Sequence, residues 1–241
     1  MRYVISDIHG CYEEYCKLLK KINFCEDDEL FLLGDATDRG PEPIRVLQDC
    51  MQRPNVFYVL GNHDAMMLSV LRPLLTEITE ESIRDLPQNL LLQCADWMNN
   101  GGDVTLQQFR ALPRAEQEDI LCYLEEASAY EMLEHRGKLY ILVHAGLNHF
   151  EPTKELDEYP LNDLIWTRAD YDTPYFPGGK IFVITGHTPT PLIRPDKKPL
   201  IYQEHGHIAI DCGCVFGGKL AAYCIETGQV IYVDGKPKNK G

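Results

Sequence analysis

One stretch near the amino terminus decides the fold: residues 3–10 read Tyr3-Val4-Ile5-Ser6-Asp7-Ile8-His9-Gly10. A short apolar run is followed at once by an aspartate, a histidine and a glycine. Apolar runs of this length are typical of strands that are covered on both faces of a sheet, whereas Asp, His and Gly are common in ordinary turns. A single motif is therefore weak evidence, and its weight depends on whether the pattern returns.

The pattern returns four times along the chain. Apolar runs cover residues 30–33, 56–60, 139–143 and 181–184. The carboxyl ends of strands in an open α/β sheet meet at one edge, so the polar side chains that follow the runs should gather there. The motifs that follow the runs are Gly34-Asp35-Ala36-Thr37-Asp38-Arg39-Gly40, Gly61-Asn62-His63-Asp64, His144-Ala145-Gly146 and Gly186-His187-Thr188.

The side chains in these motifs form a set of metal ligands with carboxylate, amide and imidazole groups and no thiolate. Such a set suits Mn, Fe or Zn better than Ca or Mg. Six ligands are too many for one catalytic ion that keeps open positions, whereas two ions roughly 3.5–4 Å apart that share a carboxylate use them all. We therefore predict two divalent ions, Mn²⁺ first, with Fe or Zn as alternatives. The six candidate ligands are Asp7, His9, Asp35, Asn62, His144 and His187.

In this order the motifs resemble those of the calcineurin-like metallophosphoesterases, specifically the bacterial and phage-type branch of the phosphoprotein phosphatase family. The resemblance runs from Asp7 to His187. It implies an α/β fold, a four-layer α/β/β/α sandwich of two mixed sheets with a helical insertion. For the metals it implies that Asp7 and His9 bind the first ion, that Asp35 bridges, and that Asn62, His144 and His187 complete the second.

The resemblance also implies the residues that act on the substrate. Arg39, Arg168 and Asn62 would bind phosphate, and the planar fork of arginine suits two phosphate oxygens at once. His63 would be the proton donor, with Asp38 as its carboxylate partner. A carboxylate beside an imidazole favours the charged form, so this pair is expected to act as a general acid.

Three other residues near these motifs have simpler interpretations. Arg168 could instead be a buried partner of Asp163 or Asp170. Asp64 follows the proposed acid and is interpreted as a cap of the helix that begins there. Trp166 is expected to serve packing.

The length of 241 residues fits a single metallophosphoesterase domain over residues 1–241. Between about residues 65 and 130 the apolar residues recur at helical spacing, which predicts a helical insertion beside the site. The insertion is either a cap that selects substrates or a scaffold, and the sequence leaves both open. After residue 187 the chain returns to strands at 207–210, 220–225 and 230–233.

Charge and composition restrict the partners. The formal net charge is −14, and there is no basic stripe, so neither nucleic acid nor a membrane is expected as a partner. At the site, two divalent ions with Arg39 and Arg168 would outweigh the carboxylates, so an anionic substrate remains compatible. No apolar stretch could cross a bilayer, no signal segment precedes the first strand, and nine cysteines in an odd number fit a reducing compartment. We therefore expect a cytoplasmic protein, with its oligomeric state left open.

The expected function is hydrolysis of phosphomonoesters by a hydroxide that two metals activate. We expect phosphoserine or phosphothreonine in proteins as the substrate, with phosphotyrosine second. The alternative is a symmetrical dinucleoside tetraphosphatase, which acts on a nucleotide, and a third reading is a non-catalytic phosphate-binding module. A serine alkoxide needs a proton to leave, whereas a nucleoside diphosphate leaves as an anion, so the His63–Asp38 pair favours the protein phosphatase.

Overall fold

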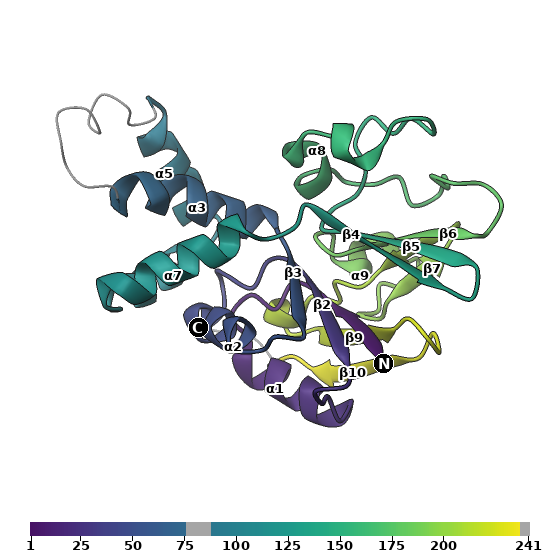
Figure 1. The fold of residues 1–241 in the computed structure, drawn as a ribbon, viewed down its shortest axis with the longest axis horizontal. Coiled ribbons are helices and arrows are strands. Elements are labelled where there is room, and N and C mark those ends of the chain that lie inside the picture. The colour runs from purple at the N-terminus through teal and green to yellow at the C-terminus, as the bar shows by residue number, and fades with distance from the viewer. Residues whose placement is uncertain (76–87, 237–241) are drawn as a thin grey trace.

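The computed structural model describes residues 1–75 and 88–236, which form two five-stranded sheets with helices around them (Figure 1). In the first sheet the strand order is β10-β9-β1-β2-β3. β1, β2 and β3 run parallel to one another, whereas β9 and β10 add an antiparallel edge. The strands are β1 (Arg2–Ile5), β2 (Glu29–Leu33), β3 (Val56–Val59), β9 (Lys219–Cys224) and β10 (Val230–Asp234).

The second sheet has the strand order β4-β5-β6-β8-β7. Its centre is parallel, from β5 through β6 to β8, and each edge carries an antiparallel strand. Both sheets are therefore mixed, as predicted. The strands are β4 (Tyr130–His135), β5 (Lys138–Val143), β6 (Ile181–Thr185), β7 (Tyr202–Glu204) and β8 (His207–Ala209).

The two faces of each strand enter different parts of the core, because successive side chains of a strand point to opposite sides. In β1, Val4 lies in the apolar cluster between the sheets, together with Leu33 of β2 and Leu142 of β5. Its neighbour Ile5 faces the other way, into the cluster that the helices α1 (Tyr12–Lys21) and α2 (Pro43–Met51) complete. These apolar strands are covered on both faces, as their composition predicts.

The outer face of the second sheet is also covered. Ile141 and Val183 pack against Leu164 and Ile165 of the helix α8 (Leu161–Ile165). A further short helix, α9 (Thr190–Ile193), follows β6. The order helix, sheet, sheet, helix confirms the predicted four-layer α/β/β/α sandwich.

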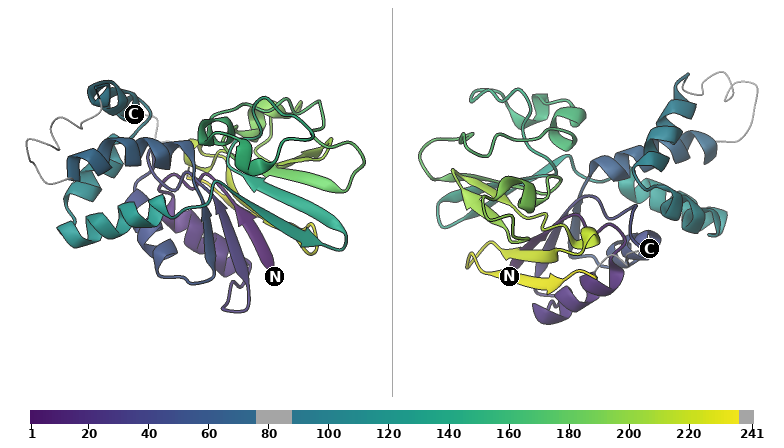
Figure 2. Two further views of the ribbon diagram at one scale, coloured as in Figure 1. Left: turned by 45° about the horizontal axis from the view of Figure 1, so that its top comes forward. Right: turned by 180° about the vertical axis from the view of Figure 1, so that it is seen from behind.

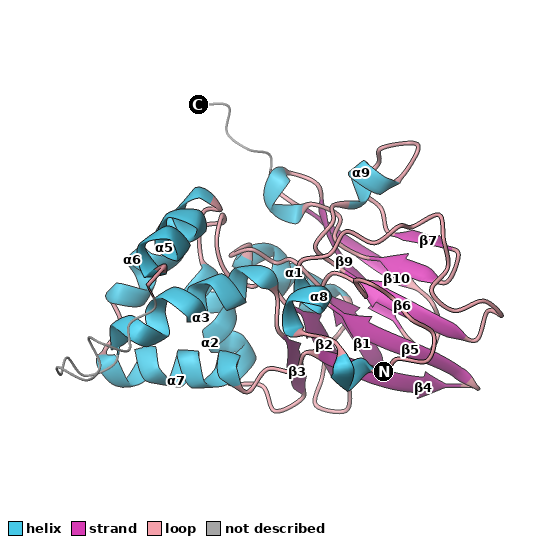
Figure 3. Ribbon diagram, turned by 90° about the horizontal axis from the view of Figure 1, so that it is seen from above, coloured by secondary structure: helices cyan, strands magenta, loops and turns pink. Residues whose placement is uncertain are grey.

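Within the described residues, four helices lie between β3 and β4 and stand beside the two sheets (Figures 2 and 3). Trp97, Phe109 and Leu121 of these helices belong to the same apolar cluster as the outer face of the first sheet. Residues 76–87 of the predicted insertion lie outside the described residues, and the division into one domain over 1–241 stays a proposal. The helices are α3 (Asn62–Leu75), α5 (Leu90–Asn99), α6 (Asp103–Arg110) and α7 (Arg114–Glu125).

The sequence analysis missed two strands, β4 and β7. β4 pairs with β5 through a tight turn in which Arg136 and Gly137 both have positive φ, 48° and 72°, as a hairpin turn of two residues requires. Both missed strands are edge strands with several polar residues, so they lack the continuous apolar run that identified the others. None of the helices formed by residues 1–75 and 88–236 has the length and apolar character needed to cross a membrane.

We predict that Leu142→Ala lowers the free energy of unfolding by about 2–5 kcal/mol, because it leaves a cavity where the two sheets pack. Leu142 has no solvent exposure. Met132→Ala on the adjacent strand is the control, since Met132 is 52% exposed and its loss should change stability by less than about 0.5 kcal/mol. Urea unfolding of both variants measures the difference, and equal losses would contradict the packing described here.

Candidate active site

All the site residues predicted from the five sequence motifs lie in the segments that follow the carboxyl ends of parallel strands. Asp7 and His9 follow β1, and Asp35 follows β2. Asn62 begins α3 directly after β3, while the second sheet contributes from the loops after β5 and β6. The two sheets present these edges side by side, so residues up to 180 positions apart in the chain come into contact. The residues after β5 and β6 are His144 and His187.

The backbone is strained at most of these positions. Six of the predicted site residues have a positive φ, between 43° and 70°, a region that residues other than glycine rarely adopt. Each such residue costs about 1–3 kcal/mol and persists only where the surrounding structure holds it, which happens most often at functional sites. The six residues are Asp7, His9, Asp35, Asp38, Arg39 and His187.

Two glycines allow the chain to approach the carboxylates closely. A Cβ on Gly186 would overlap Asp7 Oδ2, and a Cβ on Gly61 would overlap Asp35 Oδ1. These glycines are needed for the space they leave, because neither has a positive φ. The backbone of one loop thus lies directly against the carboxylate of another.

Asp35 stands at the centre of two groups of possible metal ligands. Its Oδ2 lies 3.6 Å from His9 Nε2 and 3.5 Å from His144 Nε2. One group contains Asp35 with His9 and His63, and the other contains Asp35 with His144 and His187. A carboxylate that belongs to both groups has the position that a bridging ligand needs.

The imidazoles are oriented as metal ligands usually are. The Nδ1 of His9 lies 2.7 Å from the carbonyl oxygen of Thr37, and the Nδ1 of His144 lies 2.7 Å from that of Leu33. When Nδ1–H donates to a carbonyl, Nε2 is left free to bind a cation. The donor set of these residues therefore fits divalent ions held by oxygen and imidazole nitrogen.

Asn62 and Asp7 complete the set. Asn62 Oδ1 lies 2.9 Å from His144 Nε2 and 2.8 Å from His187 Nδ1, so these three groups converge on one point. The carboxylate of Asp7 accepts the backbone N–H of His187 at 3.0 Å. All six predicted ligands are thus in one cluster, and the role of each stays a prediction.

Burial sets the charge of these groups. It raises the pKa of Asp7, with nearby Asp211 adding to the effect, and raises the pKa of Asp35, with Asp64 adding to it. It also lowers the pKa of His9 well below its usual range and that of His187 to about 2. Neutral imidazoles are the form that binds metal, and buried carboxylates need a positive charge nearby. Bound cations would meet both requirements, because they bind neutral imidazoles and compensate the charge of buried carboxylates.

The proposed acid pair is in contact. His63 Nδ1 lies 2.7 Å from Asp38 Oδ2. The same carboxylate accepts a hydrogen bond from Trp97 Nε1 at 2.9 Å and one from Thr105 Oγ1 at 2.7 Å. Burial raises the pKa of Asp38 to about 7, although these two donors lower it. Trp97 and Thr105 come from α5 and α6, so the helical insertion contributes to the site directly.

Arg39 also contacts the proposed acid His63. Its guanidinium lies 2.6 Å from His63 Nε2 and 2.7 Å from His9 Nε2. Burial and this cation lower the pKa of His63 to about 2, so in this arrangement Asp38 does not keep the imidazole charged. A cation on His9 Nε2 would displace the guanidinium, because both need the same lone pair.

Arg168 also lies at the site. It lines a cavity of about 510 Å³ together with Arg39 and His187. The alternative of a buried partner is not met, because Arg168 is exposed. The two carboxylates proposed for that role bind elsewhere, Asp163 to Asn148 and Asp170 to Thr173.

Asp64 does more than the helix cap that the sequence suggested. Its Oδ2 accepts the backbone N–H groups of Asp35 and Gly61, at 2.8 and 3.1 Å, and the hydroxyl of Tyr58 at 3.0 Å. Its Oδ1 accepts the hydroxyl of Thr37 at 3.0 Å. Asp64 therefore joins the loops after β2 and β3 and fixes the backbone that carries Asp35.

Three further residues of the site escaped the sequence analysis. Trp97 and Thr105 gave no signal, because they reach Asp38 from helices whose position the sequence does not specify. Asp211 did carry one, since it follows the strand at 207–210 as Asp7 follows the first strand. It is 5% exposed and accepts the N–H of Gly213.

This fold and this cluster define a phosphoesterase. A sequence model of the calcineurin-like phosphoesterases matches residues 2–233, so the chain belongs to that family. It is 30% identical to the asymmetrical bis(5'-nucleosyl)-tetraphosphatase PrpE of Geobacillus sp. (strain WCH70), over 95% of this chain and 92% of that protein. It is 27% identical to the symmetrical bis(5'-nucleosyl)-tetraphosphatase of Baumannia cicadellinicola, over 98% and 93%.

Solved structures agree with the fold. One, provisionally described as a diadenosine tetraphosphatase, has a TM-score of 0.65 and 22% identity, over 98% of this chain and 93% of that one. A protein serine/threonine phosphatase from Saccharomyces cerevisiae has a TM-score of 0.57 and 11% identity, over 100% and 81%. The chain is thus a hydrolase of the metallophosphoesterase fold with candidate sites for divalent metals.

The prediction of a protein serine/threonine or tyrosine phosphatase is wrong. The relatives that match nearly the whole chain are named as tetraphosphatases of dinucleotides, which favours the alternative reading. The argument from Asp38 failed because a carboxylate beside His63 does not by itself make a general acid. Burial raises the pKa of Asp38 and lowers that of His63, and Trp97, Thr105 and Arg39 also contact the pair; none of this is visible in the sequence.

We predict that Asp35→Asn removes most of the bound metal and reduces turnover at least about a hundredfold, because it takes away the one carboxylate shared by both ligand groups. Metal analysis after dialysis and the rate on p-nitrophenyl phosphate measure the two effects. Asp27→Asn is the matched control, since Asp27 is an exposed carboxylate. Full retention of metal in the Asp35 variant would contradict the bridging role.

We predict that Thr105→Val moves the acidic limb of the pH–rate profile to higher pH. The hydroxyl lowers the pKa of Asp38, so its loss should raise that pKa further above about 7. The ionised carboxylate then forms only at higher pH, and activity that depends on it is lost earlier on acidification. Thr105→Ser keeps the hydroxyl and should keep the profile. An unshifted limb in the valine variant would separate Asp38 from the activity.

Proposed function

We propose that this protein hydrolyses bis(5'-nucleosyl) tetraphosphates, a reaction that cleaves a phosphoanhydride bond and yields two nucleotides. The observation that carries the proposal is the similarity over almost the whole length to relatives named for this substrate. Both asymmetrical and symmetrical tetraphosphatases are among these relatives, and the two kinds cleave different phosphoanhydride bonds. The products that this protein forms would therefore identify the bond that it cleaves. The site described above supplies the groups that such a substrate needs.

The polyphosphate would bind at the two arginines. Arg39 and Arg168 line one cavity beside His187, and each can meet two phosphate oxygens with its planar fork. Elsewhere the chain is acidic, with a net charge of −14, so an extended polyanion is attracted only where cations gather. A small nucleotide fits this distribution better than a charged macromolecule does.

Two divalent ions would be held by Asp35 and the five other predicted ligands. When bound, such ions lower the pKa of water and neutralise charge on phosphoryl oxygens. The residues of this chain orient the site: Thr37 and Leu33 fix the imidazoles through their carbonyls, and Asp64 fixes Asp35. We propose manganese as the native metal, with iron or zinc as alternatives, to be separated by reconstitution with each.

The state of His63 suits this reaction. A nucleoside polyphosphate leaves readily as an anion, so its departure needs little proton donation, in contrast to a serine alkoxide. A pKa of about 2 leaves His63 neutral, with its Nδ1 toward Asp38 and its Nε2 toward Arg39. In this proposal His63 and Asp38 position Arg39 for the phosphate.

We predict that, with added Mn²⁺, kcat/KM for diadenosine tetraphosphate exceeds that for a phosphoserine peptide at least about a hundredfold. The reason is that the peptide offers one phosphate and a poor leaving group. Chromatography of the products distinguishes two ADP from ATP with AMP, and Asp35→Asn controls for contaminating activity. A preference for the phosphopeptide would overturn the proposed function.

A further inference from the structure

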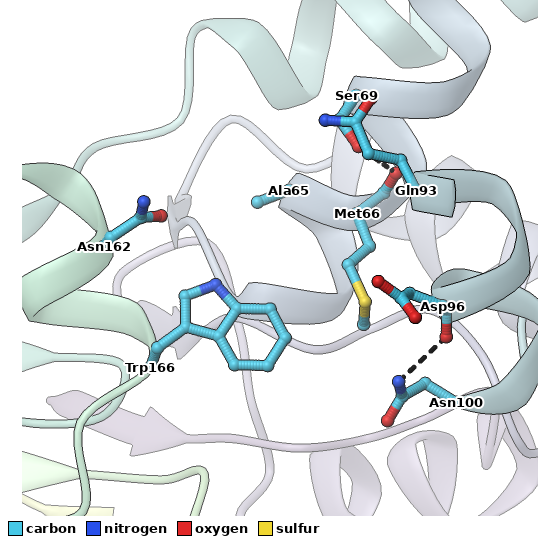
Figure 4. Close-up of a pocket in the computed structure, with 8 residues that line it drawn as sticks. All are labelled: Ala65, Met66, Ser69, Gln93, Asp96, Asn100, Asn162 and Trp166. Carbon is cyan, nitrogen blue, oxygen red and sulfur yellow. Dashed lines mark hydrogen bonds between the residues drawn. The ribbon is translucent and has the colours of Figure 1, made fainter. Parts of the chain in front are cut away.

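A cavity of about 410 Å³ lies between the helical insertion and α8 (Figure 4). Its volume is within the range of about 300–1,000 Å³ that is usual for small-molecule sites. Trp166 and Asn162 form one wall, and residues of α3 and α5 face them. The residues that matter below are Met66, Gln93, Asp96, Asn100, Asn162 and Trp166.

We infer that this cavity binds one nucleobase of the substrate, stacked on the indole of Trp166. The inference rests on the proposed function, because it specifies how that function selects nucleotides. The sequence suggested that Trp166 serves packing, but its side chain is 44% exposed and faces the cavity. An exposed aromatic face with Met66 opposite is suited to a flat aromatic ring.

The position of the cavity fits a base whose phosphates lie at the metal ligands. The Trp166 ring packs edge to face against the ring of His187, with the centroids 6.4 Å apart. Met66 lies four residues after Asn62 on the same helix, which is about 6 Å along the helix axis. Asn100 precedes Gly101, whose carbonyl accepts the backbone N–H of Arg39. The cavity and the candidate metal site are therefore immediate neighbours.

The charge of the cavity favours a base over a phosphate. None of the described residues that line it is cationic, and Asp96 adds a carboxylate. The arginines line a different cavity, together with His187. A phosphate would be repelled by Asp96, whereas the amino group of a base can donate to it. The substrate is thus oriented, with its neutral base here and its phosphates at the arginines.

The polar groups can read the edge of a base. Gln93 Oε1 is buried and has no hydrogen-bond partner among the described residues. A buried acceptor without a partner is costly, and a ligand that donates a hydrogen bond to it would remove that cost. Asn and Gln amides pair well with adenine, accepting from its amino group and donating to its ring nitrogen. Gln93, Asn100 and Asn162 therefore make the cavity suited to a purine with an exocyclic amino group, such as adenine.

The first test compares substrates with and without a base. In Trp166→Leu we expect KM for diadenosine tetraphosphate to rise about 10- to 100-fold, the range expected for a lost base stack, and to rise more than KM for p-nitrophenyl phosphate, which has no base. Trp166→Phe keeps an aromatic face and should restore most of the affinity. Phe57→Leu, an exposed aromatic residue outside the cavity, is the matched control. An unchanged KM in Trp166→Leu would overturn the inference.

A second test does not depend on turnover and separates the two proposals. Calorimetry with the metal-loaded protein should show that AMP binds at least tenfold more tightly than ribose 5-phosphate, which lacks the base. Trp166→Leu should abolish this difference, and Gln93→Leu should reduce it while leaving ribose 5-phosphate unaffected. Equal binding of AMP and ribose 5-phosphate to the wild-type protein would refute the base site. Failure to cleave diadenosine tetraphosphate despite selective AMP binding would refute only the proposed function.

Discussion

The structure depends on one electrostatic constraint: carboxylates are buried at the place where two sheets meet. Asp35 is 1% exposed and Asp7 is 3% exposed, and no arginine or lysine forms a salt bridge with either within the described residues. A buried carboxylate is costly unless a positive charge or several donors compensate it. The nearest groups are imidazoles, an amide and backbone N–H groups, which hold the carboxylates in place.

The surroundings of Asp35 show how the chain maintains this arrangement. Asp64 accepts hydrogen bonds from both neighbouring loops, and Gly61 and Gly186 permit contacts that a side chain would block. Positive φ values at six site residues add strain, which the packed strands on either side must overcome. The strained backbone that positions the site residues therefore lowers local stability, and the packing of the two sheets offsets this loss.

The helical insertion links this centre to substrate choice. Through Trp97 and Thr105 it binds Asp38, and through Met66 and Gln93 it forms one wall of the cavity beside the site. Whether the insertion is a cap or a scaffold stays a prediction, which the proposed base site would decide in favour of a cap. A change in this region would alter the state of His63 and the shape of the cavity together.

The sequence by itself determined the layered fold and the identity of the clustered residues. Each apolar run ends in a polar motif, and parallel strands bring their ends to one edge whatever the loops do, so Asp7, Asp35 and His187 were predictable. The edge strands β4 and β7 were not, because a half-polar strand is recognised only from the partner it pairs with. The tertiary structure alone decided that His63 is buried against Arg39, that Asp64 supports Asp35, and that Trp166 faces a cavity. These features depend on contacts between segments that are far apart in the chain and on the burial that shifts pKa values. Neither produces a repeating pattern of residues that could be recognised in the sequence.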